Sequence, residues 1–279
     1  MKTLLSFGHG YSAQALAEHL IPDGWRVIGT SRTPEKRQQE GVEMVAYPGA
    51  DMTPYLAEAT HILMSAAPDE AGDPVLRELG EQISAGEYEW LGYLSTTGVY
   101  GDHQGAWVGE DAALTPATKR GQWRVDGEKA WLAAHPNTHL FRLAGIYGPG
   151  RGPFSKVRNG TARRIIKEGQ VFSRIHRDDI AQVLAASIAR PNPGAAYNLC
   201  DNMPAPPEDV IGYAAELLGM PLPPAEPFET AEMSPMARSF YGESKRVRND
   251  RIKDELGVVL KFPDYKAGLQ DLLRQEQAK

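Results

Sequence analysis

The sequence has a single cysteine among its 279 residues and no long apolar run. Cys200 cannot form an internal disulfide, which is typical of a reducing compartment. No apolar stretch approaches the roughly 20 residues that a membrane-spanning helix needs. The apolar start of the chain is broken at Gly8 and Gly10. We therefore expect a strand there instead of a signal peptide, and a cytoplasmic protein that does not enter a membrane.

The sequence also has no excess of basic residues. The chain has 30 Lys and Arg against 36 Asp and Glu, a formal net charge of -6. A surface that binds nucleic acid is therefore not expected. No His-x-x-x-His or clustered carboxylate pattern indicates a metal site. With 42% hydrophobic residues the chain can bury a full core and needs no disulfide or metal to stabilise it.

The first half of the sequence alternates short apolar runs with helical patterns. The expected buried strands are residues 3–7, 26–30, 42–46, 61–65, 90–95 and 139–143, and the expected helices include 13–20, 73–83 and 120–134. This alternation predicts a doubly wound parallel sheet, the α/β arrangement of a Rossmann fold.

The character of the sequence changes near residue 150, where the strand rhythm fades and Pro and Gly increase. We expect residues 1–150 to form a Rossmann domain. Residues 151–279 are expected to form mostly a small C-terminal α/β cap, with segments that return to the sheet.

A glycine motif follows the first expected strand and opens the first expected helix. The residues from Gly8 to Ala13 fit the pattern G-x-G-x-x-A, which is typical of dinucleotide-binding turns. Gly8 permits the tight turn and Gly10 lets the backbone approach a pyrophosphate, which the helix N-terminus then holds. The candidate cofactor-binding residues are Gly8, Gly10, Tyr11, Ser12 and Ala13. The alternative is an ordinary strand–helix turn.

The end of the second expected strand bears on the choice of cofactor. An NAD-specific chain usually has an acidic residue here that binds the ribose 2′-hydroxyl. This chain has Thr30, Ser31 and Arg32 instead. Ser31 and the forked guanidinium of Arg32 suit a 2′-phosphate, so NADP is favoured over NAD. The alternative is that Arg32 is a solvated loop residue.

Three further residues follow expected strands and are positional candidates for cofactor binding. Asp51 could accept a hydrogen bond from the adenine amino group. Ser65 and Ala66 begin a loop of small residues that could pass along a cofactor. An acidic turn residue and a small-residue loop are also ordinary structure.

Six stretches of the sequence match motifs of a known superfamily. They are SFGHGYSAQALA (6–17), LSTTGVYGD (94–102), FRLAGIYGPGR (141–151), RIHRDDIA (174–181), AAYNLCDN (195–202) and RVRNDRIKDELG (246–257). Together they resemble the extended short-chain dehydrogenase/reductase superfamily, which includes nucleotide-sugar epimerases and dehydratases, and in particular its atypical, epimerase-like branch. The resemblance spans nearly the whole chain. It implies a Rossmann domain with a C-terminal substrate cap, a turn at Pro149 that passes under the nicotinamide, and a possible homodimer through the helix at 120–134.

The catalytic residues that this resemblance implies are only partly present. The catalytic Ser/Thr falls on Thr96, whose hydroxyl would hold a carbonyl or alcohol oxygen. The Tyr and Lys of the usual Tyr-x-x-x-Lys pair fall on Arg124 and Glu128. Arg124 could be an anion clamp or oxyanion stabiliser and Glu128 a base. The alternative is an i, i+4 ion pair on the helix surface. A Tyr-x-x-x-Lys pattern at 241–245 lies far along the chain and is interpreted as a chance match.

Two functions therefore remain open. The first is an NADP-dependent oxidoreductase or epimerase-like enzyme that acts on a small or nucleotide-linked metabolite. The second is a non-catalytic NADP-binding sensor or interaction protein, which the loss of the Tyr and Lys favours.

Overall fold

The computed structural model describes residues 1–278 and is organised around a seven-stranded parallel sheet. Its strands are β1 (Thr3–Phe7), β2 (Arg26–Ser31), β3 (Val42–Ala46), β4 (His61–Met64), β5 (Trp90–Thr96), β7 (Thr138–Leu143) and β11 (Ala196–Leu199). They lie in the order β11-β7-β5-β4-β1-β2-β3. The six strands predicted from the sequence are confirmed to within one residue at each end.

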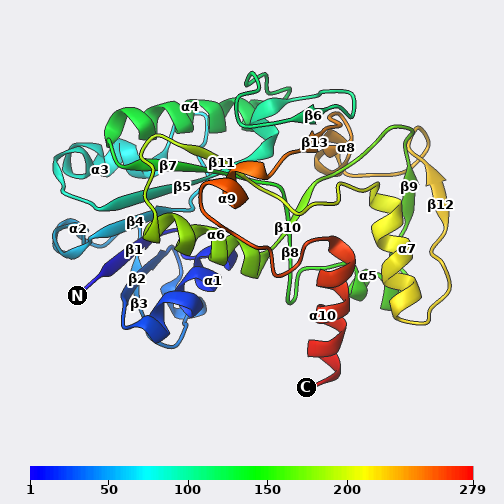
Figure 1. Cartoon of the computed structure of the whole chain (residues 1–279), viewed down its shortest axis with the longest axis horizontal. Coiled ribbons are helices and arrows are strands. Elements are labelled where there is room, and N and C mark those ends of the chain that lie inside the picture. Colours follow the sequence, from blue (N-terminus) through cyan, green and yellow to red (C-terminus); the bar gives the residue numbers. More distant parts are fainter. Residues whose placement is uncertain (279) are drawn as a thin grey trace.

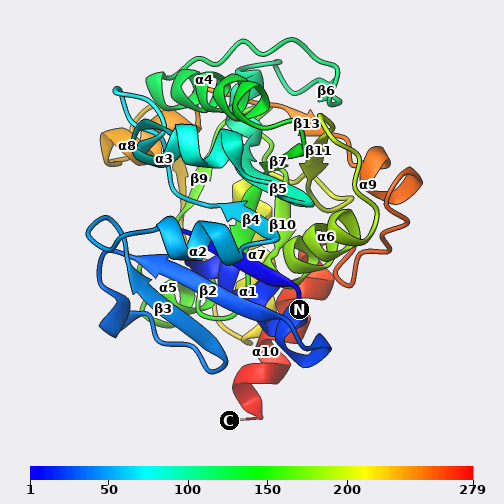
Figure 2. The same cartoon turned by 90° about the vertical axis from the view of Figure 1, so that its left-hand side faces the viewer.

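Helices cover both faces of this sheet (Figures 1 and 2). One face carries α1 (Tyr11–Leu20) and α6 (Arg177–Ala189), and the other carries α2 (Thr53–Glu58), α3 (Pro74–Ala85) and α4 (Lys119–Ala134). Strand β1 is buried on both sides, because Leu4 belongs to the core under α1 and α6 while Leu5 belongs to the core on the other face. The predicted doubly wound Rossmann fold is therefore confirmed.

The strand order reverses between β1 and β4. From β1 the chain proceeds outward through β2 and β3, then returns to β4 and proceeds the other way through β5, β7 and β11. In open α/β sheets this reversal leaves a crevice at the carboxyl ends of the two central strands, where ligands bind. The glycine motif lies directly after β1, and Ser65 and Ala66 lie directly after β4.

The second half of the chain adds smaller elements beside the sheet. We define the cap as α5 (Phe154–Arg158), β9 (Arg164–Ile166), α7 (Pro207–Leu217), β12 (Ala225–Pro227), α8 (Pro235–Phe240) and α10 (Tyr265–Gln277). Figure 1 shows β9, β12 and α7 to the right of the main sheet, with α10 to the left of α7 and extending lower. Tyr147, Phe154, Ala214 and Leu269 belong to a separate small hydrophobic core here.

Two short parallel sheets lie between the cap and the seven-stranded sheet. Strand β8 (Gly145–Tyr147) pairs with β10 (Arg174–His176), and β6 (Trp107–Val108) pairs with β13 (Arg246–Val247). Other late segments lie on the main sheet: α6 covers one face, β11 forms an edge, and α9 (Asp250–Asp254) packs near β11. Cys200, directly after β11, is fully buried, and its Sγ donates to the carbonyl of Val247 at 3.2 Å.

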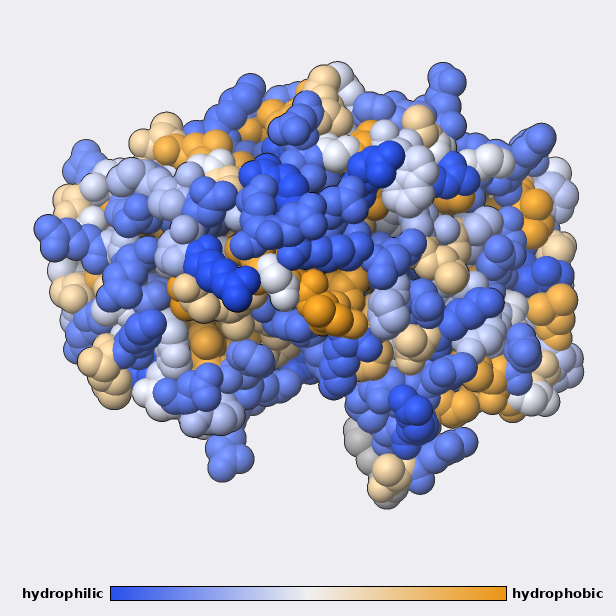
Figure 3. Space-filling model, viewed as in Figure 1, coloured by the Kyte–Doolittle hydropathy of each residue, from blue (hydrophilic) through white to orange (hydrophobic). Residues whose placement is uncertain are grey.

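The face seen in Figure 1 is hydrophilic over most of its area, with hydrophobic side chains in scattered groups (Figure 3). Within residues 1–278, no helix combines the length and apolar character needed to cross a membrane. The same residues contain no cluster of three or more His, Cys, Asp or Glu side chains arranged to hold a metal ion.

Candidate functional site

The glycine turn after β1 is fixed by its neighbours. Gly8 has φ +77°, and a Cβ atom on it would lie 2.9 Å from the backbone nitrogen of Ala66. Its own N–H donates to Oγ1 of Thr30 at 3.1 Å, and the N–H of His9 donates to the Thr30 carbonyl at 2.8 Å. Only glycine can adopt this left-handed backbone and also leave room for the β4 loop, the segment that begins with Ser65 and Ala66 after β4.

The N-terminus of α1 is open beyond this turn. Gly10 is the N-cap residue, no side chain caps the helix, and its first turn contains no acidic residue. The only heavy atom near a Cβ placed on Gly10 would be the Gly8 carbonyl oxygen, at 3.7 Å. The first-turn N–H groups, which include those of Tyr11, Ser12 and Ala13, therefore have no side-chain acceptor and suit an anion.

His9 contributes to this turn in a way that the motif did not predict. Its ring turns onto β2, where a Cβ atom on Gly29 would lie 2.6 Å from the ring. Nε2 of His9 lies 2.7 Å from Oε1 of Gln39. Burial lowers the pKa of His9, which keeps the imidazole neutral. The sequence signal for this packing is the small residue at position 29, opposite the glycine turn.

The end of β2 presents polar groups and no carboxylate. Ser31 Oγ accepts a hydrogen bond from the N–H of Thr33 at 3.1 Å. The side chain of Arg32 is exposed and makes no hydrogen bond or ion pair with any of residues 1–278. Its guanidinium is therefore free to bind an anion at this end of the crevice.

The candidates after β3 and β4 have different surroundings. Oδ1 of Asp51 accepts from the N–H of Thr53 at 2.9 Å, which lowers the pKa of this exposed carboxyl and assigns it a local role at the start of α2. Ser65 and Ala66 are half-buried at the end of β4, and Ala66 lies against Gly8. Ser65 and Ala66 thus form one wall beside the glycine turn, and the adenine contact of Asp51 stays a prediction.

A hydrogen bond joins the start of α1 to the turn after β8. The hydroxyl of Tyr11 donates to the Pro149 carbonyl at 2.9 Å, so two predicted cofactor residues 138 positions apart are in contact. The guanidinium groups of Arg151 and Arg177 lie 5.8 and 5.1 Å from the centre of the Tyr11 ring. Arg177 also pairs with Glu18, which offsets its charge. Arg151, which the motif at 141–151 contains, has no ion-pair partner among residues 1–278 and raises the positive potential near the N-terminus of α1.

Thr96 is the last residue of β5. It is half-buried, and its Oγ1 accepts from the N–H of Gly98 at 3.1 Å. The hydroxyl proton is not used in that contact and can be donated. The side chain therefore combines a fixed position with a free donor, close to the carboxyl end of β5.

Glu128 has a structural role. Its carboxylate is 2% exposed and accepts from Ser95 Oγ at 2.6 Å. It also forms a buried ion pair with Arg142, whose Nη2 lies 2.9 Å from Oε2 and whose Nε lies 3.1 Å from Oε1. Arg142 continues to the hydroxyl of Tyr100 at 2.9 Å. The structure contradicts the interpretation of Glu128 as a base, because its oxygens are already bound by three donors and closed off from solvent.

Arg124 does not pair with Glu128, so the alternative of a helix-surface ion pair is also wrong. Its Nη1 donates to the Leu94 carbonyl at 2.8 Å and to the Tyr93 hydroxyl at 3.3 Å. Glu128 is on the buried side of α4, which faces the sheet. The side chain of Arg124 instead extends along the ends of the strands. The spacing i, i+4 could not show this, because the partner of Glu128 comes from β7.

The Tyr-x-x-x-Lys pattern in the second half does not form a catalytic pair. Nζ of Lys245 donates to the Gly101 carbonyl at 2.7 Å and pairs with Glu243 at 2.6 Å. The ring of Tyr241 stacks on Phe228, with centroids 5.2 Å apart. The two side chains have different partners, as the interpretation of a chance match requires.

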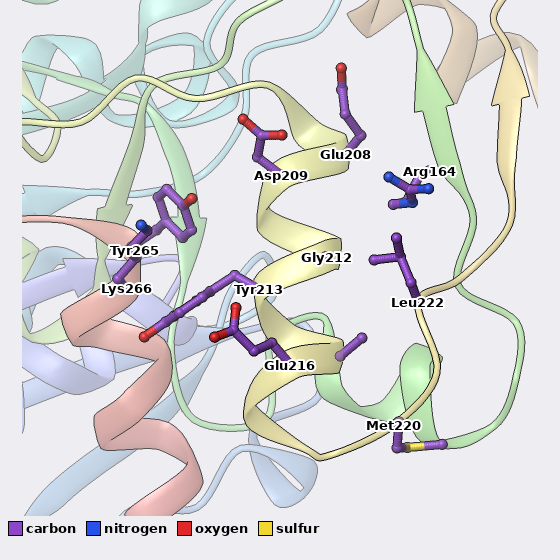
Figure 4. Close-up of a pocket in the computed structure, with 11 residues that line it drawn as sticks. Arg164, Glu208, Asp209, Gly212, Tyr213, Glu216, Met220, Leu222, Tyr265 and Lys266 are labelled. Carbon is purple, nitrogen blue, oxygen red and sulfur yellow. The ribbon is translucent and has the colours of Figure 1, made fainter.

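A pocket of about 550 Å³ lies within the cap, between α7, α10 and β9 (Figure 4). Both charges line it: Arg164 and Lys266 are basic, and Glu208 is among the acidic residues. Its lining includes no residue of the glycine turn or the β4 loop. The volume suits a small molecule, but the pocket is separate from the crevice at the strand ends.

No protein-family model and no curated protein matches this chain. Solved structures share its fold. UDP-glucuronic acid 4-epimerase from Bacillus cereus, in complex with NAD, is 16% identical, with 98% of this chain and 97% of that chain covered and a TM-score of 0.79. dTDP-glucose 4,6-dehydratase from Bacillus anthracis, also with NAD, is 15% identical, with coverage of 100% and 97% and a TM-score of 0.78.

The epimerase and the dehydratase have the same overall fold as this chain, which is the fold that the sequence motifs predicted. A functionally unknown conserved protein from Silicibacter pomeroyi is 61% identical to this chain. The alignment covers 99% of each chain with a TM-score of 0.95, and this chain belongs to the same family.

Proposed function

We propose that this protein binds a nicotinamide dinucleotide across the crevice at the strand reversal. The observation that carries the proposal is the N-terminus of α1, which no side chain caps. The turn before it packs against Ala66 after β4, and only glycine fits at position 8 of this turn. The NAD complexes of the epimerase and dehydratase with the same fold support this choice of ligand class. The adenosine half would lie toward β2 and the pyrophosphate at Tyr11 and Ser12.

Within this proposal, the cofactor is NADP. Ser31 and the unpaired Arg32 are at the end of β2, where an NAD-specific chain has an acidic residue. The two neighbours named above hold NAD, at 15–16% identity. For that reason the test compares both cofactors directly.

Arg32→Ala is expected to weaken NADPH binding about tenfold, because a charge-assisted bond to the 2′-phosphate is lost. NADH binding should change less than twofold. The measurement is a titration of the purified protein with each cofactor by calorimetry or by nicotinamide fluorescence. Arg37→Ala removes a neighbouring exposed arginine and is the matched control. Equal losses for NADPH and NADH would rule out a 2′-phosphate contact, and no binding of either cofactor would overturn the whole proposal.

The activity proposed is that of an oxidoreductase or epimerase-like enzyme on a small or nucleotide-linked metabolite. Thr96 supports it, since its free hydroxyl proton can be donated to a substrate oxygen at the end of β5. No phenol replaces the missing Tyr on α4, because Arg124 stands there, and a guanidinium does not release its proton.

That substitution favours a second candidate, a cofactor-binding sensor without turnover. The two candidates differ in one observable. An oxidoreductase oxidises NADPH in the presence of some carbonyl compound, whereas an epimerase-like enzyme converts its substrate to an isomer with no net change in the cofactor. Thr96→Val should slow either reaction while leaving NADPH affinity within twofold. A sensor binds NADPH, and neither the cofactor nor any compound of the same panel is converted.

A further inference from the structure

The side chain of Arg124 crosses the carboxyl ends of two strands. From α4, its Nη1 reaches the carbonyl of Leu94 on β5 at 2.8 Å and the carbonyl of Ala66 after β4 at 3.5 Å. The guanidinium lies 5.6 Å from the centre of the Tyr93 ring. Nη1 alone therefore holds the side chain beside both strands.

The remaining donors of this guanidinium have no protein partner. Nη2 and Nε of Arg124 make no hydrogen bond or ion pair with the part of the chain that the structure describes, and the side chain is half-buried. No carboxylate compensates its charge, since Glu128 is paired with Arg142. A half-buried cation with free, fixed donors is arranged to meet acceptor oxygens of a ligand.

The position of Arg124 indicates which part of the ligand it meets. A doubly wound sheet consists of two mononucleotide-binding halves. The half formed by β1, β2 and β3 carries the glycine turn and Arg32, and so would take the adenosine. The ends of β4 and β5, which Arg124 spans, belong to the other half. Ala66 lies against Gly8, so the guanidinium stands beside the crevice where the two halves meet.

We infer that Arg124 binds the nicotinamide half of the dinucleotide, through acceptor oxygens of its ribose phosphate. The inference rests on the proposed cofactor binding and assigns Arg124 a cofactor-binding role in place of the catalytic role expected from the sequence. Because a guanidinium is permanently charged, this contact persists across the pH range in which the fold is stable.

The test uses a ligand that contains only one of the two halves. Adenosine 2′,5′-bisphosphate carries the adenosine and the 2′-phosphate but lacks the nicotinamide ribose. Arg124→Met is expected to weaken NADPH binding about tenfold and to leave adenosine 2′,5′-bisphosphate binding within twofold. Arg124→Lys, which keeps a cation, should restore part of the NADPH affinity. Lys129→Met, an exposed position on the same helix, is the matched control and should bind both ligands normally.

The possible outcomes separate this inference from the proposal on which it rests. Equal weakening of both ligands by Arg124→Met, or weakening of neither, would overturn the inference while cofactor binding stands. Failure of the unaltered protein to bind either NADPH or NADH would overturn the proposed function itself. Because Arg124→Met also removes the bond to Leu94, the thermal midpoint of each ligand-free variant is measured. A partial rescue by Arg124→Lys at equal midpoint supports a ligand contact over a purely structural one.

Discussion

Replacement of Arg142 by leucine is expected to lower the free energy of unfolding by about 3–5 kcal/mol. The variant leaves the Glu128 carboxylate, which is 2% exposed, buried without its cationic partner. It also removes the donors to the Tyr100 hydroxyl and the Glu110 carbonyl. Most of the cost is the uncompensated charge, since burying a lone carboxylate is far less favourable than burying a paired one. Urea denaturation at pH 7 measures the change.

Two further variants test this explanation. Arg26→Leu removes a half-buried arginine that pairs with Glu43 and Glu58, and should cost less than about 1 kcal/mol because solvent already screens these two pairs. The double variant with Glu128→Leu and Arg142→Leu removes both buried charges and should be more stable than Arg142→Leu alone. A double variant that is less stable than Arg142→Leu would show that packing, and not charge, dominates at this site.

Asp201→Asn is expected to stabilise the protein at pH 8, by roughly 2 kcal/mol. Asp201 is 1% exposed beyond the end of β11, and its Oδ2 has no hydrogen-bond partner. Burial raises the pKa of this carboxyl from 3.8 to about 7. The folded state thus prefers the protonated form, and the neutral amide avoids the cost of a buried charge at high pH. The amide gives up the attraction of the nearby Arg174, which limits the gain.

The stability gained by Asp201→Asn is expected to depend on pH. The folded pKa is above the unfolded one, so the contribution of Asp201 is most favourable below about pH 4 and is lost as the pH rises through 7. The advantage of Asp201→Asn should therefore shrink as the pH falls from 8 to 4. Thermal midpoints across this range measure it. A variant that is less stable than the unaltered protein at pH 8 would contradict the assignment of a buried carboxyl whose Oδ1 accepts from the N–H of Met203 while Oδ2 has no partner.

Asp179 provides the contrasting control. Burial also raises its pKa, to about 6, but both of its oxygens accept backbone hydrogen bonds. Oδ1 accepts from Lys261 at 2.7 Å and Oδ2 from Phe262 at 3.1 Å. An asparagine has one acceptor oxygen, so Asp179→Asn leaves one of these N–H groups without a partner and should be destabilising by about 1–3 kcal/mol. The two aspartates thus respond in opposite directions to the same substitution.

The sheet could be predicted from the sequence because parallel strands buried on both faces leave mainly apolar runs. TLLSF at β1 and HILM at β4 are examples, and each ends within a residue of its predicted boundary. Strand β11 was not predicted from its pattern, because AYNL is short and carries Asn198, whose side chain accepts from the Tyr100 hydroxyl. A buried polar residue conceals a strand from a hydrophobicity pattern, although its partner makes it acceptable.

In the candidate site, too, the features that depend on neighbouring residues in the sequence could be predicted, and those that depend on distant residues could not. The glycine turn could be identified because its requirement is local: a left-handed backbone at Gly8, followed at once by a helix. The roles of Arg124 and Glu128 could not, because they depend on residues from other strands. Glu128 meets Arg142 on β7, and Arg124 meets carbonyls on β5 and after β4. Spacing along a helix contains no information about which strand faces each of its sides.

The burial of Cys200 gives the chain an intrinsic chemical reporter. Its thiol is the only one in the sequence and is enclosed between β11 and the backbone of Val247. Burial raises the pKa of this thiol well above its usual range, so the reactive thiolate is scarce in the folded state. Alkylating reagents can reach the sulfur only when the edge of the sheet opens. The rate of labelling therefore records opening events at a single known location, without any engineered probe.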